Sequence, residues 1–433
     1  MTTDYATHYL PNGIRLIFMP TPKFKTITMG LYIHQELNEK LAPLNALLSA
    51  VLEQGSRFYP DNLTLRRELE NLYGADLSTD IIKSGERHMI ACHLETVHGK
   101  YVGGNDKLLR SGMSILGSVM GDPLIEDNGF KKEYVDQEKD QLVKEIRSLV
   151  NDKGTYALEQ CLRTMCSEER YGVYRLGCIE NYDHINRESL YSYYRELLFN
   201  NPIDLYIIGE LEEEQVLEAA REALAFKCSE KKLVLPAVEI DYPVQEVKSL
   251  EEEMVVNQAK LVLGFRTYTG FSDAEYCSLL VYSGVLGGFP HSKLFQQVRE
   301  EAGLAYYIYS RLDGHKGLMV IAAGIDYSDY AKAIAIIDRQ IEAMVAGKIS
   351  TSEMENTKHA LINLIRTQQD SPSQMIYSHL DGSIGGKTYT SLELIKGIED
   401  VGLEEVKAVA SRIKKDTIYL LRPRDGGSQP ESQ

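Results

Sequence analysis

The histidines and cysteines of this 433-residue chain are the side chains best suited to metal or redox chemistry. His88, His93 and His98 form a suggestive group, because imidazoles commonly bind Zn²⁺. Their spacing of five residues fits neither one helical face nor one strand face, so we interpret them as structural or surface residues. The six cysteines include no C-x-x-C pair, which indicates neither a zinc ribbon nor a redox motif. Cys161 and Cys166 could lie near each other, and we expect these two to be reduced, buried thiols.

The composition restricts the classes of function that remain. A formal net charge of -16 argues against a general nucleic-acid binder, which would present a basic surface. The chain is long enough for two or more domains. No apolar run approaches the length of a membrane span, and the N-terminal residues lack the pattern of a secretory signal. We therefore expect a soluble, cytoplasmic protein.

The elements that would position a site repeat along the chain, which reads as two copies of one α/β plan. The first copy opens with a predicted hairpin, with a tight primed turn at Asn12-Gly13. Its next elements are a strand over 26–33, helices over 43–56 and 63–77, and a strand over 87–95. The second copy repeats this order with a strand over 258–267, helices over 274–288 and 291–310, and a strand over 317–325. Longer helices close each copy, including a charged one over 132–152.

Strands followed by separate helices favour an α+β fold, with helices on one face of a mostly antiparallel sheet. We expect two homologous α/β sandwich domains that form a clamshell. The predicted boundaries are 1–226 for the first domain, 227–248 for a linker, 249–425 for the second domain and 426–433 for a disordered tail.

The helix over 43–56, PLNALLSAVLEQGS, resembles the helix that carries H-x-x-E-H in zinc metallopeptidases of the pitrilysin and insulinase family, to which mitochondrial processing peptidase is related. In that family the motif runs on into a Gly-Thr pair, which Gly55-Ser56 matches. Ala46 and Ala50 then take the places of the two histidines, and Ser49 takes that of the glutamate. The resemblance covers nearly the whole chain and implies a degenerate zinc site. Because two methyl groups and a hydroxyl cannot supply zinc ligands and a general base, we expect no metal and no catalytic residue in this chain alone.

The same resemblance singles out two acids on the charged helix over 132–152. Glu145 matches the family's third zinc ligand, and Glu138 matches a glutamate two helical turns earlier. Carboxylates without imidazoles make a weak zinc site. The alternative is that both acids belong to a solvated charged face, and we favour that reading over a retained metal role.

In the second half, GGFPHSKLFQQVREEAGLAY resembles the family segment in which a Gly-rich turn leads into a helix that ends in arginine, with a tyrosine seven residues later. Arg299 and Tyr306 hold the two matching positions. The resemblance implies that they contact the substrate and stabilise an oxyanion. The alternative is that Arg299 pairs with Glu300 or Glu301 while Tyr306 packs in a core.

A degenerate zinc helix with a retained arginine and tyrosine is typical of the silent partner in bacterial two-chain members of the family. The first hypothesis is therefore an inactive subunit of a heteromeric zinc peptidase, which acts on a peptide or protein substrate with a homologous partner that carries H-x-x-E-H and the zinc ion. The second is a non-catalytic clamshell that binds a peptide or protein and assists the 5-aminopentanol modification of elongation factor P. This link comes only from resemblance to a silent member of a paired set in Gram-positive bacteria. A structural subunit like the core proteins of respiratory complexes and an independent metalloenzyme are the remaining hypotheses.

Overall fold

The computed structural model describes residues 5–103, 107–229 and 231–424. It divides into two compact units that interleave along the chain. The first unit contains Met1–Arg147, Val173–Ala237 and Ser371–Ser378, and the second contains Ser148–Gly172, Val238–Asp370 and His379–Gln433. Relative to the boundaries expected from the sequence, 148–172 joins the second unit and 371–378 joins the first. The expected tail, 426–433, lies outside the described residues.

The first unit is built on a six-stranded sheet with the order β1-β2-β8-β3-β5-β4. Its strands are β1 (Ala6–Tyr9), β2 (Arg15–Pro20), β3 (Thr26–Glu36), β4 (Asp76–Ser84), β5 (Arg87–Val97) and β8 (Ile203–Gly209). Only β2 and β8 pair in parallel, and β4 forms one edge. The sheet is therefore mostly antiparallel, as predicted.

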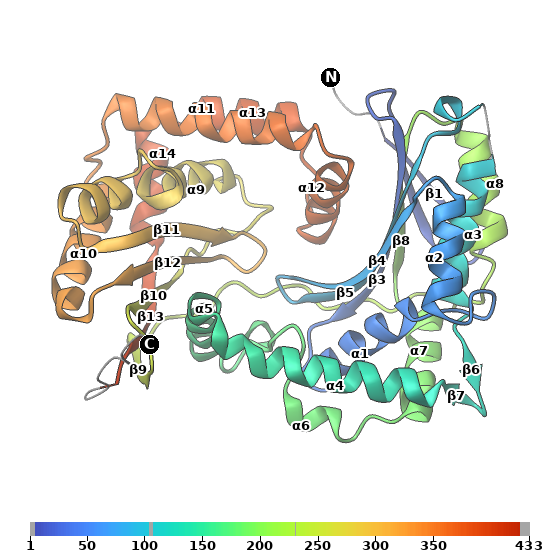
Figure 1. Cartoon of the computed structure of the whole chain (residues 1–433). Helices are drawn as coiled ribbons and strands as arrows, with labels where there is room; N and C mark the ends of the chain where they lie inside the picture. The colour runs from blue at the N-terminus through green and yellow to red at the C-terminus, as the bar shows by residue number, and fades with distance from the viewer. Residues whose placement is uncertain (1–4, 104–106, 230, 425–433) are drawn as a thin grey trace, which may run out of the picture. The chain divides into compact units, whose positions relative to one another are not determined.

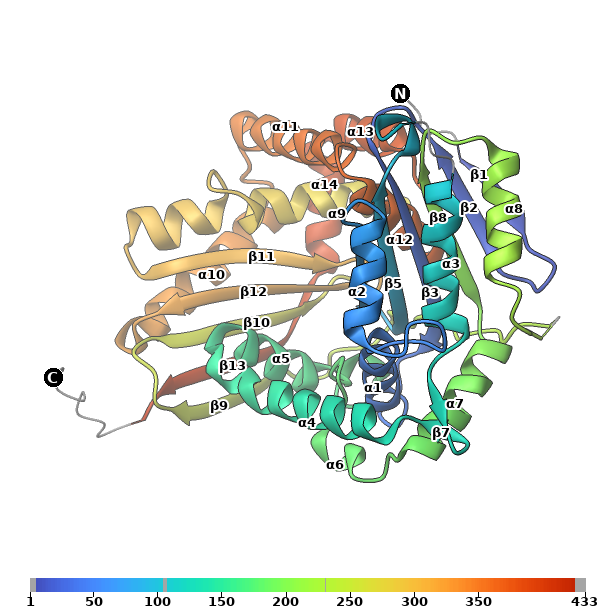
Figure 2. The ribbon, with the colours of Figure 1, turned by 45° about the vertical axis from the view of Figure 1, so that its right-hand side comes forward.

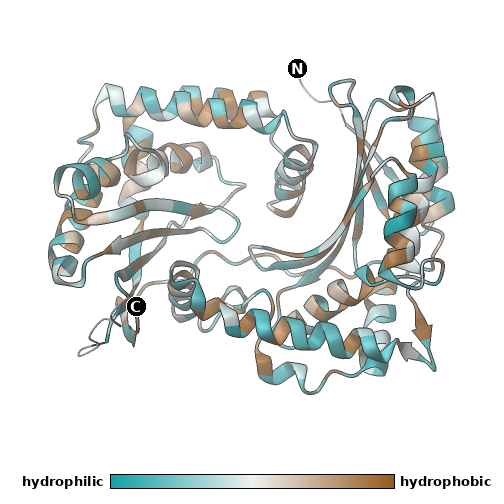
Figure 3. Ribbon diagram, viewed as in Figure 1, coloured by the Kyte–Doolittle hydropathy of each residue, from teal (hydrophilic) through white to brown (hydrophobic). Residues whose placement is uncertain are grey.

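Helices cover this sheet and enclose the hydrophobic core of the first unit. They are α1 (Ala42–Glu53), α2 (Asn62–Asn71), α3 (Lys107–Gly121), α4 (Lys132–Ser148), α6 (Ile179–Tyr182), α7 (Arg187–Asn200) and α8 (Glu213–Ala223). Figure 1 shows α2, α3 and α8 along the same side of the sheet. A short ribbon of β6 (Ile125–Glu126) and β7 (Gly129–Phe130) precedes α4. Figure 3 shows α4 as largely hydrophilic, and Val135 and Leu142 are its buried residues.

The second unit is built on a five-stranded sheet with the order β11-β12-β10-β13-β9. Its strands are β9 (Lys248–Met254), β10 (Ala259–Arg266), β11 (Ala305–Asp313), β12 (Leu318–Ile325) and β13 (Lys414–Pro423). Its helices are α5 (Lys153–Met165), α9 (Tyr276–Ser283), α10 (Tyr330–Val345), α11 (Thr351–Gln368), α13 (Ser391–Asp400) and α14 (Leu403–Arg412), with π-helical turns at η4 (Gly284–Gly288) and η5 (Phe295–Glu301). The helix α12 (Pro372–Ile384) has residues in both units.

Buried contacts explain why residues 148–172 belong to the second unit. The helix α5 lies across β10 and β13 (Figure 2), where Ala157 and Cys161 join a buried apolar cluster. Beyond α5, the carboxylate of Glu169 accepts hydrogen bonds from Arg266 Nη1 at 3.1 Å and lies 2.8 Å from Lys316 Nζ. All three side chains are buried. Such a pairing is needed, because an unpaired charge in this position would be strongly destabilising.

The two sheets repeat one topology, which confirms the prediction of two copies in an α+β fold. The strand order β2-β8-β3-β5-β4 of the first unit corresponds to β9-β13-β10-β12-β11 of the second. In each copy the one parallel pair lies at the same place, β2 with β8 and β9 with β13. The hairpin strand β1 is the addition in the first copy.

Three predicted elements differ from the structure. The hairpin has a five-residue loop over 10–14, because only Gly13 of the Asn12-Gly13 pair has a positive φ, at 81°. The helix predicted over 63–77 ends at Asn71, and positive φ angles at Tyr73 and Gly74 turn the chain into β4. The helix predicted over 291–310 ends at Glu301, because Gly303 adopts a φ of 65° and the following residues form β11.

Candidate functional site

The degenerate zinc helix, α1, lines a small cavity in the first unit. It packs against β4 and β5, with Ala46 2% and Ser49 3% exposed. The cavity has a volume of about 280 Å³. Its lining includes all five positions that the family resemblance singled out in this half, namely Ala46, Ser49, Ala50, Glu138 and Glu145. The fold thus brings the two retained acids of α4 to the face of α1 where the family's ligands would lie.

A guanidinium neutralises the acid at the third-ligand position. Arg175 Nη2 donates a hydrogen bond to Glu145 Oε1 at 2.7 Å, and Arg175 Nη1 lies 4.0 Å from Asp80 Oδ1. The cavity offers methyl groups instead of imidazoles, and its retained ligand position is already paired with a cation. Zinc sites need three ligands that donate electron pairs, so these residues do not fit zinc. Among the described residues, no group of three histidine, cysteine or acidic side chains could hold a metal ion.

The other acids of the cavity have neutral hydrogen-bond donors. Gln54 Nε2 donates to Glu138 Oε1 at 2.9 Å, and Gln137 Nε2 reaches the same oxygen at 3.3 Å. Burial, with a contribution from the Glu53 carboxylate, raises the pKa of Glu138. Glu53 itself accepts from the backbone N–H of Thr79 at 3.2 Å and from its Oγ1 at 2.9 Å. The carboxylates of Glu53 and Glu138 are thus held in place by neutral groups.

His88 holds the backbone of Arg175 in position. Its Nε2 donates to the Arg175 carbonyl oxygen at 2.8 Å, which requires the proton on Nε2 because a carbonyl only accepts. Its Nδ1 accepts from Asn45 Nδ2 of α1 at 2.9 Å, and Asn45 Oδ1 accepts from Tyr193 at 2.6 Å. Burial, above all, lowers the pKa of His88 to about 4. The imidazole is therefore a neutral structural link between α1 and the segment that carries Arg175.

The other two histidines of the sequence group lie apart from this cavity. His93 Nε2 is 3.3 Å from the hydroxyl of Tyr377, and His98 Nε2 donates to the carbonyl oxygen of Glu210 at 2.7 Å. All six cysteines are free, and Cys92, Cys161 and Cys166 are buried. These contacts agree with the structural roles expected from the sequence.

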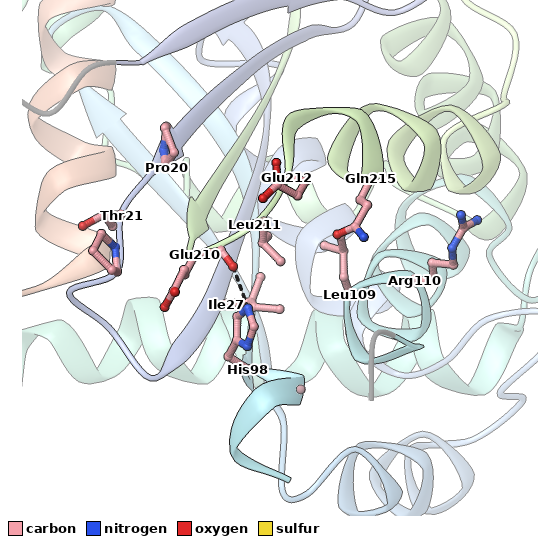
Figure 4. Close-up of a pocket in the computed structure, with 12 residues that line it drawn as sticks. Pro20, Thr21, Ile27, His98, Leu109, Arg110, Glu210, Leu211, Glu212 and Gln215 are labelled. Atoms are coloured by element: carbon pink, nitrogen blue, oxygen red, sulfur yellow. Dashed lines mark hydrogen bonds between the residues drawn. The ribbon is translucent and has the colours of Figure 1, made fainter. Parts of the chain in front are cut away.

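A larger cavity of about 770 Å³ lies at the ends of β2, β3 and β8 (Figure 4). Its lining combines the apolar Ile27, Leu109 and Leu211 with charged groups at the rim. Some of those groups are engaged with one another or with neighbours. His98 bonds to Glu210, as Figure 4 shows, and Arg110 pairs with Glu218 and Glu222 of α8. This cavity holds none of the site residues that the sequence predicted.

The second unit carries Arg299 and Tyr306 on consecutive elements. Arg299 lies in η5, where its guanidinium stands 4.6 Å from the Phe295 ring centroid and 3.8 Å from the Glu300 carboxylate. Its side chain is 41% exposed. Tyr306 is 75% exposed and lies in β11 at the register shift between Ala305 and Tyr307. The structure therefore contradicts the alternative that Tyr306 packs in a core, whereas the pairing of Arg299 with Glu300 is present as a long, half-exposed contact.

Sequence reasoning missed Arg175, Glu53 and the edge strand β4. Arg175 lies thirty positions beyond its partner Glu145, so no short-range spacing pattern links the two residues. Glu53 lies one turn beyond Ser49 on α1, so the i, i+4 spacing on the helix was the signal that could have found it.

Comparisons with known proteins agree with this architecture. A family model described as "Peptidase M16 inactive domain" matches residues 184–361. Over 420 residues the chain is 32% identical to "Probable inactive metalloprotease YmfF" of Bacillus subtilis (strain 168), an alignment that covers 96% of this chain and 97% of that protein. It is 21% identical to "Uncharacterized zinc protease YmxG" of the same organism, over 97% of this chain and 98% of that one.

Solved structures show the same fold. A crystal structure of a conserved protein from Enterococcus faecalis V583 matches with a TM-score of 0.90 and 27% identity, over 98% of this chain and 100% of that chain. A crystal structure of a peptidase M16 inactive domain from Pseudomonas fluorescens matches with a TM-score of 0.78 and 15% identity, over 99% and 100% of the two chains.

Proposed function

The chain belongs to the M16 peptidase family as a proteolytically inactive homologue, and on this premise we propose that it is the silent subunit of a heteromeric zinc peptidase. A homologous partner with H-x-x-E-H holds the zinc ion, and this chain supplies Arg299 and Tyr306 to the substrate bound there. The observation that carries the proposal is that both side chains are exposed while alanines occupy the two zinc-binding histidine positions of this chain.

The chemistry of the pair suits this role. A guanidinium and a phenol donate hydrogen bonds to a carbonyl oxygen that develops negative charge as water attacks. The partner's zinc supplies the activated water, so nothing in this chain has to move a proton. Among the described residues no helix is long and apolar enough to cross a membrane, and we place the complex in the cytoplasm.

The test uses the native complex. The tagged chain is co-expressed with the zinc-protease homologue from its own organism, and the purified pair is assayed with a fluorogenic peptide library and by elemental analysis for zinc. We expect activity only in the pair, with one zinc ion per heterodimer. Arg299→Ala and Tyr306→Phe lower turnover on the order of 10–100-fold without changing the zinc content, because each removes one donor to the developing oxyanion.

Matched controls lie on β11, the strand that carries Tyr306. Tyr309→Phe and Arg311→Ala alter exposed side chains of β11 by the same chemistry, and we expect turnover within about twofold of the native pair. Equal turnover for all four variants, or failure of the two chains to associate, would show that the in-trans role is wrong.

A second candidate function is peptide binding without cleavage, as in assistance to the 5-aminopentanol modification of elongation factor P. The specific observation is that β4, an edge strand, contributes Thr79, Asp80 and Ile81 to the lining of the cavity beside α1. An extended peptide can add to a free strand edge through main-chain hydrogen bonds, and a neighbouring pocket then selects one of its side chains. Retention of elongation factor P on the immobilised chain, with no peptidase activity in any pair, favours this function over the first.

A further inference from the structure

The guanidinium of Arg299 can stabilise an oxyanion only if its long side chain is held in one orientation. The side chain is 41% exposed, and its contact with the Glu300 carboxylate is 3.8 Å long. A half-exposed ion pair of this length contributes little, because solvent screens it and two flexible side chains have to be ordered. Another group is therefore needed to fix the guanidinium.

Phe295 supplies that contact from the same element. It lies four residues before Arg299 in η5, so the two side chains share one face of the turn. The Cζ atom of Arg299 lies over the Phe295 ring, 4.6 Å from its centroid, which is within the range of a cation–π interaction. Because a guanidinium is planar, such a contact uses the face of the group and leaves the N–H donors at its edge free.

The packing around η5 separates Phe295 from the hydrophobic core. Leu294 and Val298 are fully buried and belong to the core cluster of the second unit. Phe295 is only partly buried, and it is not among the residues described in that cluster or packed against it. Within the described part of the chain, Arg299 is also the one ring contact of Phe295. The aromatic side chain at this position is therefore explained by the guanidinium.

The neighbouring acid Glu301 is engaged elsewhere on the same turn. Gln297 Nε2 donates a hydrogen bond to Glu301 Oε1 at 2.7 Å, again between residues four apart. A carboxylate paired closely with Arg299 would take up the N–H donors that a substrate oxyanion needs. The segment thus holds the charge of Arg299 with an aromatic face instead of a second carboxylate.

We propose that Phe295 is a positioning residue, whose ring orients the guanidinium of Arg299 towards the substrate oxyanion. The inference rests on the proposed in-trans function and deepens it, because it names the group that keeps Arg299 ready for the substrate. Orientation of this kind acts on the transition state, since the oxyanion develops there and a displaced donor stabilises it less. We therefore expect Phe295 to affect kcat and not KM.

The test measures the peptidase activity of the full chain purified with its zinc-bearing homologue. Phe295→Leu keeps an apolar side chain but removes the aromatic face, and we expect kcat to fall about 3- to 10-fold while KM stays unchanged. Phe295→Tyr keeps the ring and should restore most of the lost activity. Tyr327→Leu is the matched control, because it removes a ring of the same unit that lies 5.4 Å from the guanidinium carbon of Arg422. This control should leave kcat within about twofold of the native pair.

A double variant and a spectroscopic signal connect the effect to Arg299. In the Arg299→Ala background, Phe295→Leu should have no further effect on kcat, because the ring then has no guanidinium to orient. In the isolated chain labelled with ¹⁵N-arginine, the Hε signal of Arg299 is identified by its loss in Arg299→Ala. We expect Phe295→Leu to shift this signal downfield, because the shielding by the ring is lost, and Tyr327→Leu to leave it unchanged.

The possible outcomes separate this inference from the function on which it rests. Native kcat in Phe295→Leu, while Arg299→Ala is slow, would overturn the positioning role but not the in-trans function of Arg299. An additive loss in the double variant, or an Arg299 signal that is unchanged in Phe295→Leu, would also overturn the positioning role. Native turnover in Arg299→Ala would instead overturn the in-trans function and this inference together.

Discussion

The two site regions of this molecule differ in how their polar groups are satisfied. In the first unit, the polar groups around α1 are bonded within the chain: the half-exposed Glu145 pairs with Arg175, and the buried His88 holds the Arg175 backbone. In the second unit, Arg299 and Tyr306 are exposed, and the closest carboxylate to Arg299 is 3.8 Å away. A partly enclosed carboxylate without a metal ion is stabilised by a cation from the same chain, because removing a charge from water without a partner is costly. Exposed side chains such as Arg299 and Tyr306 can form hydrogen bonds with water, so they can remain available to a partner.

The largest expected effect comes from rebuilding the buried site. Ala46→His, Ser49→Glu and Ala50→His restore the ligands and base, but Arg175 still competes for Glu145. We expect Zn²⁺ to bind on the order of 10–100-fold more tightly when Arg175→Ala is added to the triple variant, as for other groups that control a ligand's orientation and charge. Titration with a zinc chelator and elemental analysis measure the affinity.

Arg175→Ala alone is the control for that experiment and should bind no zinc. If the triple variant binds zinc as tightly as the quadruple variant, the guanidinium does not take the place of the metal's charge.

Next in size is a pH effect in the first unit. The pKa of His88 is lowered to about 4, against about 6.5 in an unfolded chain, so the unfolded state binds more protons between these values. The free energy of unfolding should therefore fall as the pH drops from about 6.5 to about 4, by up to about 3 kcal/mol. Urea unfolding at several pH values measures it.

His88→Asn keeps a polar side chain and removes the titration. We expect a lower free energy of unfolding at pH 7, and loss of the His88 contribution to the slope between about pH 6.5 and pH 4. A slope identical to that of the native chain would contradict the burial argument.

Breaking the half-exposed Arg175–Glu145 ion pair should change the free energy of unfolding less than protonation of His88 does. In Glu145→Gln the charge on the carboxylate is lost while the shape remains, and the Arg175 side chain is 38% exposed. Pairs of this exposure contribute about 0–1 kcal/mol, so we expect a loss below about 1 kcal/mol in urea unfolding. A loss of several kcal/mol in the free energy of unfolding would show that this pair behaves like a buried ion pair.

The smallest effect is expected in the second unit. Arg299→Ala and Tyr306→Phe should change the free energy of unfolding of the isolated chain by no more than about 0.5 kcal/mol, because Tyr306 is largely exposed and Arg299 is half-exposed with one long ion-pair contact. This result would support the contrast with the residues around α1. It would show that Arg299 and Tyr306 contribute little to the stability of the chain and are available to a partner. A marked destabilisation would make the pair structural.

The repeated topology and the position of α1 could be predicted from the sequence, because apolar periodicity and turn residues act locally. The strand β4 could not, since the helix-like pattern of α2 runs on to Tyr73 and Gly74, whose positive φ angles end it. The Arg175–Glu145 pair joins two segments thirty positions apart, so no local spacing in the sequence predicts it. Family resemblance placed Glu138 and Glu145 beside α1. The balance of charges in the cavity could be determined only from the folded structure.

The interleaving of the two units along the chain also constrains the order in which the protein can fold. Proteins generally fold domain by domain as the nascent chain emerges. Here α5 is synthesised long before β10 and β13, the strands that it packs against. Likewise, Glu169 can form its ion pairs only after Arg266 and Lys316 have been synthesised. Residues 371–378 complete the first unit only when most of the second has emerged. Neither half can finish folding during its own translation, so a truncated product would expose apolar surface to the cell's chaperones and proteases.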